Sequence, residues 1–383
     1  MSAAPVDTVV MKFGGSSVAD PEKVRNVARR LVEAKRRGLR VVGTVSAMGK
    51  TTDTLLALAS DVSPAPNPRE LDMLLSTGER IACALVAMAI HDQGENAVSY
   101  TGSQAGILTD AAHTRAKIRE IRGDRIRTAL DEGRIVLVAG FQGFSRDTME
   151  ITTLGRGGTD ATAVALAAAL DGACEIYSDV PGVFTADPRL VPEARKLRVV
   201  SYEEMLEMAA SGAKVLMLRS VELARNHGVR IHARSTFSDE EGTWVQDAEG
   251  MEQAIVSAVT HSETDVVFTL TGIPDRPGVA ARIFDTVASA QVNVDTIIQN
   301  VVHGNAEMSF SVPEDDVEAT REVDGVTFFA ANVEEHPVDG LLDERRDAAG
   351  HIAEITLMLR PLAQLQAAVA RMARALADPG RGA

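Results

Sequence analysis

Aromatic residues, cysteines and net positive charge are all scarce in this sequence, and each shortage excludes a class of protein. The two cysteines, Cys83 and Cys174, lie in separate apolar stretches, so they offer neither a disulfide framework nor a metal-binding knuckle, and we expect buried, inert thiols. The formal net charge of −15 argues against a protein that coats nucleic acid or anionic lipid, because that function needs an excess of Lys and Arg. A single nucleotide needs only a locally positive pocket and is not excluded.

Long apolar runs are missing as well. No stretch approaches the ~18 uninterrupted apolar residues of a membrane span, and Met1–Asp7 lacks the basic and apolar regions of a secretory signal. We therefore expect a cytoplasmic protein with no membrane or nucleic-acid partner. Of the 383 residues, 45% are hydrophobic but only 4% aromatic, so the core must be built largely from Ala, Val and Leu, which suits packed α/β layers.

Up to about residue 237, short β-branched runs alternate with longer helical patterns. We expect strands at Thr8–Phe13, Arg40–Ser46, Arg134–Phe141, Cys174–Ser178 and Val229–Ala233. We expect helices at Pro21–Arg37, Arg69–His91, Asp160–Asp171, Tyr202–Ala210 and Ala213–His227. Apolar strands separated by helices predict a three-layer α/β/α sandwich around a mainly parallel sheet, which binds ligands at the carboxyl ends of its strands.

A second pattern follows a polar, acidic linker at residues 238–250. It predicts a strand at Asp265–Thr271, a helix at Pro277–Ala290, and strands at Val292–Val302 and Ala306–Val312, about half of a ferredoxin-like domain. Beyond Pro313 the signal weakens until a strand at His351–Leu359 and a helix at Pro361–Ala377. These shifts divide the chain into residues 1–248, 249–313 and 314–383.

Two glycine-rich segments follow predicted strands and carry the strongest signals for chemistry. In Lys12–Ser17, the backbone of Gly14 and Gly15 can approach phosphate oxygens while Lys12 adds a positive charge, although the spacing is not that of a Walker A loop. In Thr152–Asp160, three glycines and Arg156 meet a predicted helix N-terminus, which is suited to anions. Arg156 can bind a carboxylate with two parallel hydrogen bonds, whereas Thr159 and Asp160 also suit ordinary helix caps.

Three further segments are weaker on their own. Tyr177–Arg189 places Asp179 at a strand end, but a surface hairpin explains its turn residues equally well. Val45–Gly49, followed by Thr51, Thr52 and Asp53, offers hydroxyl and N–H groups after a strand. Glu79 lies in an apolar helical stretch, where a lone glutamate usually faces solvent, and Lys214 at the start of a predicted helix is by default a surface lysine.

Taken together, these segments resemble the amino-acid kinase family and, within it, the aspartate kinases, nearly continuously from Val9 to Thr243. The matching strings are KFGGSS (Lys12–Ser17), VSAMG (Val45–Gly49), STGER (Ser76–Arg80), GSQAG (Gly102–Gly106), AGFQG (Ala139–Gly143), TTLGRGGTDATAVALAAAL (Thr152–Leu170) and YSDVPGVFTADPR (Tyr177–Arg189). The region 266–312 resembles an ACT regulatory domain. The resemblance implies ATP-dependent phosphorylation of the L-aspartate β-carboxylate, at the head of lysine, threonine and methionine synthesis.

The resemblance also implies a role for each matching residue. Lys12 and Lys214 would face the transferring phosphoryl group, Asp160 would organise lysine and substrate, and Gly14, Gly15 and Ser16 would cradle phosphates. Ser46 and Thr52 would lie near the reacting carboxylate and phosphate, Glu79 would bind the substrate ammonium, and Arg156 would bind its α-carboxylate. Gly157, Gly158 and Thr159 would also contact the substrate. The nucleotide would lie against Ser46, Tyr177, Ser178, Asp179, Phe184, Thr185, Ala186, Asp187, Pro188, Arg189 and Lys214. Mg²⁺ would travel with ATP, without a protein metal cage.

The C-terminal region departs from the family. Its first ACT-like unit is recognisable, with Asp275, Asn293, Asp295, Gln299 and Asn300 at positions that line effector sites, whereas the second unit is short and degenerate. We therefore expect altered feedback control by lysine and threonine, and a homodimer, since ACT units commonly pair. A weaker hypothesis starts a separate subunit at Met251.

Two other functions remain open. A kinase for another small acid, such as N-acetylglutamate, shares the fold, but the Glu79 carboxylate suits a free α-ammonium better than an acylated one. A non-catalytic amino-acid sensor is disfavoured by the joint presence of Lys12, Arg156, Asp179 and Lys214, because charged residues are costly to bury without a function.

Overall fold

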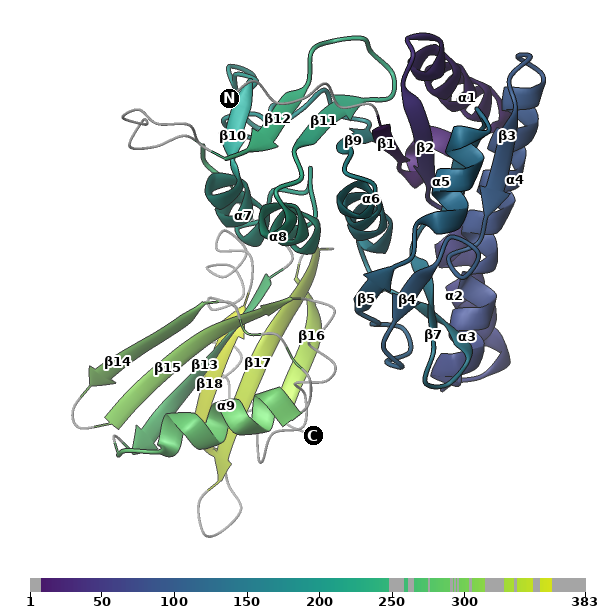
Figure 1. Cartoon of the computed structure of the whole chain (residues 1–383). Helices are drawn as coiled ribbons and strands as arrows, with labels where there is room; N and C mark the ends of the chain where they lie inside the picture. The colour runs from purple at the N-terminus through teal and green to yellow at the C-terminus, as the bar shows by residue number, and fades with distance from the viewer. Residues whose placement is uncertain are drawn as a thin grey trace. The chain divides into compact units, whose positions relative to one another are not determined.

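The computed structural model of the chain describes residues 8–247, 258–260, 265–274, 276–289, 292, 294, 296–302, 305–313, 327–333, 336–346 and 352–359. Its internal contacts divide the chain into two units, Met1–His261 and Ser262–Ala383. The first unit is built on two sheets and the second on two smaller ones (Figure 1).

The first unit contains an eight-stranded sheet of order β10-β12-β11-β9-β1-β2-β6-β3. Its strands are β1 (Thr8–Phe13), β2 (Arg40–Val45), β3 (Ala97–Tyr100), β6 (Ile135–Ala139), β9 (Ala173–Ser178), β10 (Val199–Ser201), β11 (Ile231–Ser235) and β12 (Thr243–Gln246). Neighbouring strands are parallel except β11 and β12, which are antiparallel. A four-stranded sheet, β5-β4-β7-β8, is made of β4 (Ile107–Thr109), β5 (Ile118–Ile121), β7 (Gln142–Ser145) and β8 (Glu150–Thr153).

Helices cover both faces of the large sheet. Side chains of β1 alternate between the two cores: Val9, Met11 and Phe13 pack with α1 (Pro21–Arg36) and α4 (Thr77–His91). Val10 points to the opposite face, where α5 (Asp124–Asp131), α6 (Gly158–Ala169), α7 (Tyr202–Ala210) and α8 (Leu218–His227) pack. This alternation is the period of a strand covered on both sides. The predicted three-layer α/β/α sandwich is confirmed.

Helix α6 is the most completely buried helix of this unit. All ten residues from Gly158 to Ala167 are buried, and most of them are Ala, Gly or Thr. Small side chains let the sheet and α8 approach the helix backbone closely, which larger residues would prevent. Its N-cap, Gly157, has φ 69°, and a Cβ there would lie 2.4 Å from Cγ of Met217. A glycine is therefore required at this position.

Three predicted elements have different bounds from those expected. The helix expected at 69–91 is two helices, α3 (Pro68–Leu75) and α4, interrupted at Ser76, whose hydroxyl donates back to the Met73 carbonyl. By length and hydropathy this stretch is the one candidate membrane span among the described residues, and 56% of its most apolar window is buried inside the protein. Helix α8 begins at Leu218, so Lys214 precedes it, and the strand expected from Val292 begins at Ile297.

The second unit contains two three-stranded antiparallel sheets. In the first, β13 (Asp265–Pro274), β15 (Asn305–Pro313) and β14 (Ile297–Val302) lie in that order, with α9 (Val279–Ser289), and Phe268, Val287, Val292, Phe310 and Val312 form the core. The second sheet has the order β16-β17-β18, from Thr327–Val333, His336–Arg346 and Ile352–Leu359. Strand β18 was expected, β16 and β17 were not, and the expected helix at 361–377 lies outside the described residues.

Candidate active site

Four adjacent parallel strands end at the same edge of the large sheet, and each is followed by a segment singled out in the sequence. The register pairs Phe13 of β1 with Val45 of β2 and Tyr177 of β9, and Val45 with Ala139 of β6. Gly14, Ser46, Gly140 and Asp179 therefore follow strand ends that lie side by side. This is the edge at which parallel α/β sheets bind ligands.

A buried ion pair lies at the centre of this edge. Lys12 Nζ is 2.6 Å from Oδ1 of Asp160, with side chains only 12% and 8% exposed. Asp160 is in the first turn of α6, where the helix dipole stabilises a carboxylate. Neither Thr159 nor Asp160 is the helix cap, since that position belongs to Gly157. The pair holds a lysine ammonium in a mostly water-excluded position beside the glycine loop.

The glycine loop after β1 is docked against the loop after β2. The Ser46 N–H donates to the Phe13 carbonyl, and the Gly49 N–H donates to the Gly15 carbonyl, each at 3.0 Å. A Cβ on Gly15 would lie 2.9 Å from the Ala47 carbonyl oxygen, so only glycine fits this approach. The 3₁₀ turn Gly15–Val18 follows. Two segments about thirty residues apart in the sequence thus form one backbone surface beside Lys12.

Glu79 approaches the same surface from α4. Its side chain is buried, in contrast to the expected solvent-facing glutamate, and Oε1 accepts a hydrogen bond of 3.1 Å from the Ala47 N–H. Oε2 is buried and has no hydrogen-bond partner among the described residues. Burial raises the pKa of Glu79 to about 7. The close approach depends on Gly78, where a Cβ would lie 2.8 Å from the Ala47 Cβ. A carboxylate with an unpaired, desolvated oxygen is a strong acceptor for a cation.

A second buried carboxylate, Asp72 of α3, anchors the segment that leads to Arg156. Asp72 is fully buried and accepts hydrogen bonds from the Thr153 hydroxyl at 2.5 Å and the Thr114 N–H at 3.1 Å. His113 Nδ1 lies 2.7 Å from its other oxygen. Thr153 is the last residue of β8 and precedes Arg156 by three positions. Asp72 therefore fixes the start of that glycine-rich loop.

Arg219 and Gln142 complete the support. Arg219 donates to the carbonyls of Leu154 and Ala116 at 2.9 and 3.0 Å, and burial lowers its pKa. Gln142 is buried, donates to the Ser76 carbonyl at 2.8 Å and accepts from Arg80. Asp72, Gln142 and Arg219 were not predicted as site residues. The sequence signal that could have identified them is a polar residue within an apolar or helical pattern, and Gln142 also lies in one of the family strings.

The other predicted site residues lie on the surface around this core. Ser46 is half-buried, Thr52 is half-buried in the first turn of α2 (Thr51–Val62), and Arg156, Asp179 and Lys214 are exposed. In the loop 184–189, the Thr185 N–H donates to the Arg195 carbonyl, and Arg189 pairs with Asp187 at 2.7 Å. The structure thus joins Lys12, Asp160, Gly15 and Glu79 by contacts, directly or through the loop after β2, and leaves the exposed residues to meet a ligand from outside.

The remaining predictions concern metals, thiols and effectors. Within the described part of the chain, no three His, Cys, Asp or Glu residues are grouped as metal ligands would be. Cys83 and Cys174 are buried free thiols, as expected, and burial raises the pKa of both. Gln299 and Asn300 are exposed on β14. Asp275, Asn293, Asp295 and Met251 lie outside the described residues.

Comparison with known sequences gives two family matches. The profile of the amino acid kinase family matches residues 7–235, and that of the ACT domain matches residues 267–325. The chain is 58% identical over 314 residues to the aspartokinase of Mycolicibacterium smegmatis, which covers 80% of this chain and 75% of that protein. It is 50% identical over 322 residues to the aspartokinase of Corynebacterium glutamicum, covering 82% and 76%.

Comparison with solved structures gives the same family. The crystal structure of aspartate kinase from Synechocystis matches 98% of this chain and 71% of its own, with a TM-score of 0.58 and 35% sequence identity. E. coli aspartokinase III in complex with aspartate and ADP matches 90% of this chain and 88% of its own, with a TM-score of 0.69. At 22% identity, the latter likeness is evidence for the fold alone.

Proposed function

This chain belongs to the amino acid kinase family, among the aspartokinases, and from that membership we propose that it transfers the γ-phosphoryl group of ATP to the β-carboxylate of L-aspartate. The products are ADP and 4-phospho-L-aspartate, the acyl phosphate that opens lysine, threonine and methionine biosynthesis. The structural observation that carries the proposal is the meeting of Lys12, the glycine loop and the unpaired Glu79 carboxylate on the loop after β2.

The chemistry needs little from the protein beyond positioning and charge. An oxygen of the aspartate β-carboxylate attacks the γ-phosphorus, and the bond from that phosphorus to the β,γ-bridging oxygen breaks. No general base is required, because the attacking carboxylate is already ionised near neutral pH. Catalysis then rests on aligning two anions and neutralising the charge of the transferred group.

Lys12 is the residue best placed to neutralise that charge. Its ammonium is oriented by Asp160, and the pair is only slightly exposed, so its field is weakly screened by water. The backbone of Gly14 and Gly15 and the side chains of Ser16 and Ser46 surround the phosphates in this proposal. Lys214, exposed before α8, approaches the phosphoryl group when substrates are bound.

On the amino-acid side, Glu79 and Arg156 give the substrate its orientation. The unpaired Oε2 of Glu79 accepts the substrate ammonium, a contact that returns a partner to a desolvated oxygen. Arg156 binds the α-carboxylate with two parallel hydrogen bonds, assisted by Gly157, Gly158 and Thr159 at the start of α6. Thr52 and Ser46 complete this side.

The nucleotide lies beyond the phosphates, against the end of β9 and the segment that follows it. These are Tyr177, Ser178, Asp179, Phe184, Thr185, Ala186, Asp187, Pro188 and Arg189. Mg²⁺ bound with ATP would lower the negative charge that the lysines must neutralise. The carboxylate of Asp179, exposed at the end of β9, suits this ion or its waters, and no cage of protein ligands is needed.

The second unit extends the proposal to regulation. Gln299 and Asn300, together with Asp275, Asn293 and Asp295, bind an amino-acid effector in a cytoplasmic homodimer that forms through the ACT units. The degenerate region 314–383 weakens or changes inhibition by lysine plus threonine. A titration with both amino acids that gives strong cooperative inhibition would contradict this part while leaving the catalytic proposal intact.

The catalytic proposal is tested by coupled detection of ADP release with L-aspartate, ATP and Mg²⁺. Hydroxylamine in the same reaction traps the acyl phosphate as aspartyl hydroxamate. Parallel reactions contain glutamate, N-acetylglutamate or no acid. Aspartate-dependent release of ADP together with hydroxamate is expected. ADP release with N-acetylglutamate but not with aspartate would instead identify a kinase for another acid, and no turnover in protein that binds ATP would indicate a sensor.

A further inference from the structure

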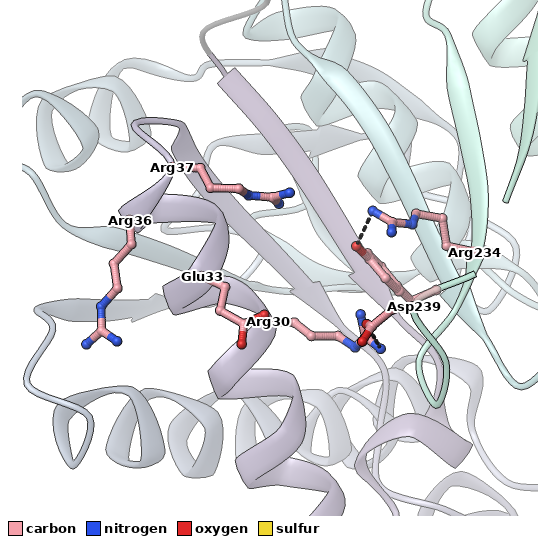
Figure 2. Close-up of a pocket in the computed structure, with 7 residues that line it drawn as sticks. Arg30, Glu33, Arg36, Arg37, Arg234 and Asp239 are labelled. Atoms are coloured by element: carbon pink, nitrogen blue, oxygen red, sulfur yellow. Dashed lines mark hydrogen bonds and ion pairs between the residues drawn. The ribbon is translucent and has the colours of Figure 1, made fainter. Parts of the chain in front are cut away.

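A cavity of about 460 Å³ lies beside α1, formed by side chains outside the phosphate loops. Arg30, Glu33, Arg36 and Arg37 of α1 line one side, and Tyr177 of β9, Arg234 of β11 and Asp239 complete it (Figure 2). No residue of the Lys12–Asp160 centre lines this cavity, and its floor is the ring of Tyr177, near the end of β9.

The cavity is locally positive on a strongly acidic protein. Its lining residues include four arginines and two carboxylates, whereas the whole chain carries a formal charge of −15. Arg36 points away and pairs with Glu95, and Arg37 and Arg234 point toward the centre (Figure 2). A positive site that persists in such a background concentrates anions locally.

Two of these arginines have side-chain N–H groups without a hydrogen-bond partner among the residues that the structure describes. The Arg37 guanidinium is exposed and forms no hydrogen bond or ion pair with any residue that the structure describes. Nε of Arg234 is buried and has no hydrogen-bond partner in the same part of the chain, although its Nη1 donates to the Tyr177 hydroxyl at 3.2 Å. A buried N–H without a partner costs free energy that a ligand oxygen would recover.

The floor of the cavity is rigid. The Arg30 and Arg234 guanidinium carbons lie 5.5 and 5.4 Å from the centre of the Tyr177 ring. Arg30 is fixed further by donating to the carbonyls of Thr236 and Ser238, both at 2.9 Å. A ligand therefore meets arginines that are already ordered and loses less conformational entropy on binding.

The cavity already holds one anion from the chain itself. Asp239 Oδ1 lies 3.1 Å from Nη2 of Arg30, although the aspartate side chain is 85% exposed. The Arg30 side chain is only 7% exposed, but the aspartate side of the pair is open to water, so a ligand oxygen can replace the carboxylate at this guanidinium. The Asp239 carboxylate marks where the oxygen of a ligand would lie.

We propose that this cavity is a binding site for a small multivalent phosphate anion. Guanidinium groups bind phosphate oxygens in pairs, and two or more of them favour a ligand with several charges over a single carboxylate. The volume fits a small phosphorylated molecule. The cavity shares Tyr177 with the proposed nucleotide site but no residue with the Lys12–Asp160 centre, and the inference does not depend on the identity of the kinase substrate.

The test is calorimetric titration of inorganic pyrophosphate into the full-length protein and into matched variants on α1. Arg37→Ala removes a cavity arginine, and Arg25→Ala removes an exposed arginine on the same helix outside the cavity. We expect Arg37→Ala to weaken pyrophosphate binding about tenfold or more, and Arg37→Glu to abolish it, while Arg25→Ala binds like the wild type. Any binding at the phosphate loops appears as a component that is the same in all four proteins.

Three results would overturn the proposal. The first is unchanged pyrophosphate affinity in both Arg37 variants, and the second is an equal loss in Arg25→Ala, which would indicate only a general charge effect. The third is equally tight binding of citrate, which would show that the site does not select phosphate. Both arginines are exposed, so thermal denaturation without ligand should give the same Tm for all variants.

Discussion

The buried carboxylate of Glu79 makes the stability of this protein depend on pH in a way that one substitution should remove. Burial raises the pKa of Glu79 from the ordinary 4.5 to about 7. Below about pH 4.5 the group is protonated whether the chain is folded or unfolded, and its contribution to stability is fully present. Between about pH 4.5 and about 7 the carboxyl group ionises in the unfolded chain but stays protonated in the folded one. Ionisation lowers the free energy of the unfolded state, so the folded state loses stability as the pH rises to about 7.

The size of this loss follows from the two pKa values. The difference between 4.5 and about 7 corresponds to about 3 kcal/mol at pH 8, at about 1.4 kcal/mol for each pH unit. In Glu79→Gln the amide is neutral at every pH, its oxygen can still accept from the Ala47 N–H, and its nitrogen replaces the unpaired Oε2. The variant should therefore be more stable than the wild type at about pH 8, by roughly 6–12 °C in Tm, and similar to it near pH 4.5.

The assay is thermal denaturation of both proteins, without ligands, across this pH range. Glu207→Gln, which changes an exposed glutamate on α7, is the control and should track the wild type throughout. Adding L-aspartate at pH 8 should raise the wild-type Tm more than that of Glu79→Gln, because the substrate ammonium pairs with the ionised carboxylate. A Tm difference between wild type and Glu79→Gln that does not change with pH would refute the reasoning.

Three other substitutions test the site in the ADP-release assay. Lys12→Met removes the cation beside Asp160 and should lower kcat by about 10²–10³-fold with little change in the KM for ATP; near-normal kcat would contradict its role. Arg156→Lys keeps the charge but loses the paired donors, so it should raise the KM for aspartate roughly tenfold, and an unchanged KM would argue against carboxylate binding. Asp72→Asn leaves one hydrogen bond, such as that from Thr153, without its carboxylate acceptor, and should lower the free energy of unfolding by ~1–3 kcal/mol and raise the KM for aspartate. A loss of stability with an unchanged KM would indicate a purely structural role.

Much of the fold could be predicted because strand and helix signals in the first unit agree with the tertiary packing. β1 matches the predicted Thr8–Phe13, because a short, mostly apolar run that ends at Gly14 is typical of a buried strand. The short strands β3, β4, β5, β7, β8, β10 and β12 were missed, because three- and four-residue strands carry too little pattern to be distinguished from loops. Strand β12 lies within residues 238–250, which were expected to be a linker.

Part of the candidate site could likewise be predicted from the sequence, and part could not. Lys12 and the glycines could be predicted as site residues because they lie at the end of a strand and directly after it, and their closeness to one another could be expected. The burial of Glu79 was not, because it depends on how closely Gly78 lets α4 approach Ala47, a tertiary fact with no local signal. Asp72 was missed for the same reason, since its partner Thr153 is 81 residues away.

The burial of α6 from Gly158 to Ala167 has a consequence for how this enzyme can change over time. The helix carries Asp160 at one end, and its small side chains are held between the sheet and α8. A larger side chain at any position of Ala161–Ala167 would displace the whole helix, because the close-packed core leaves no space for an added methyl group. Adaptation to heat or cold therefore cannot adjust packing here without also moving the carboxylate that orients Lys12. Variation in this helix should be found as compensated pairs with neighbouring residues rather than as single substitutions.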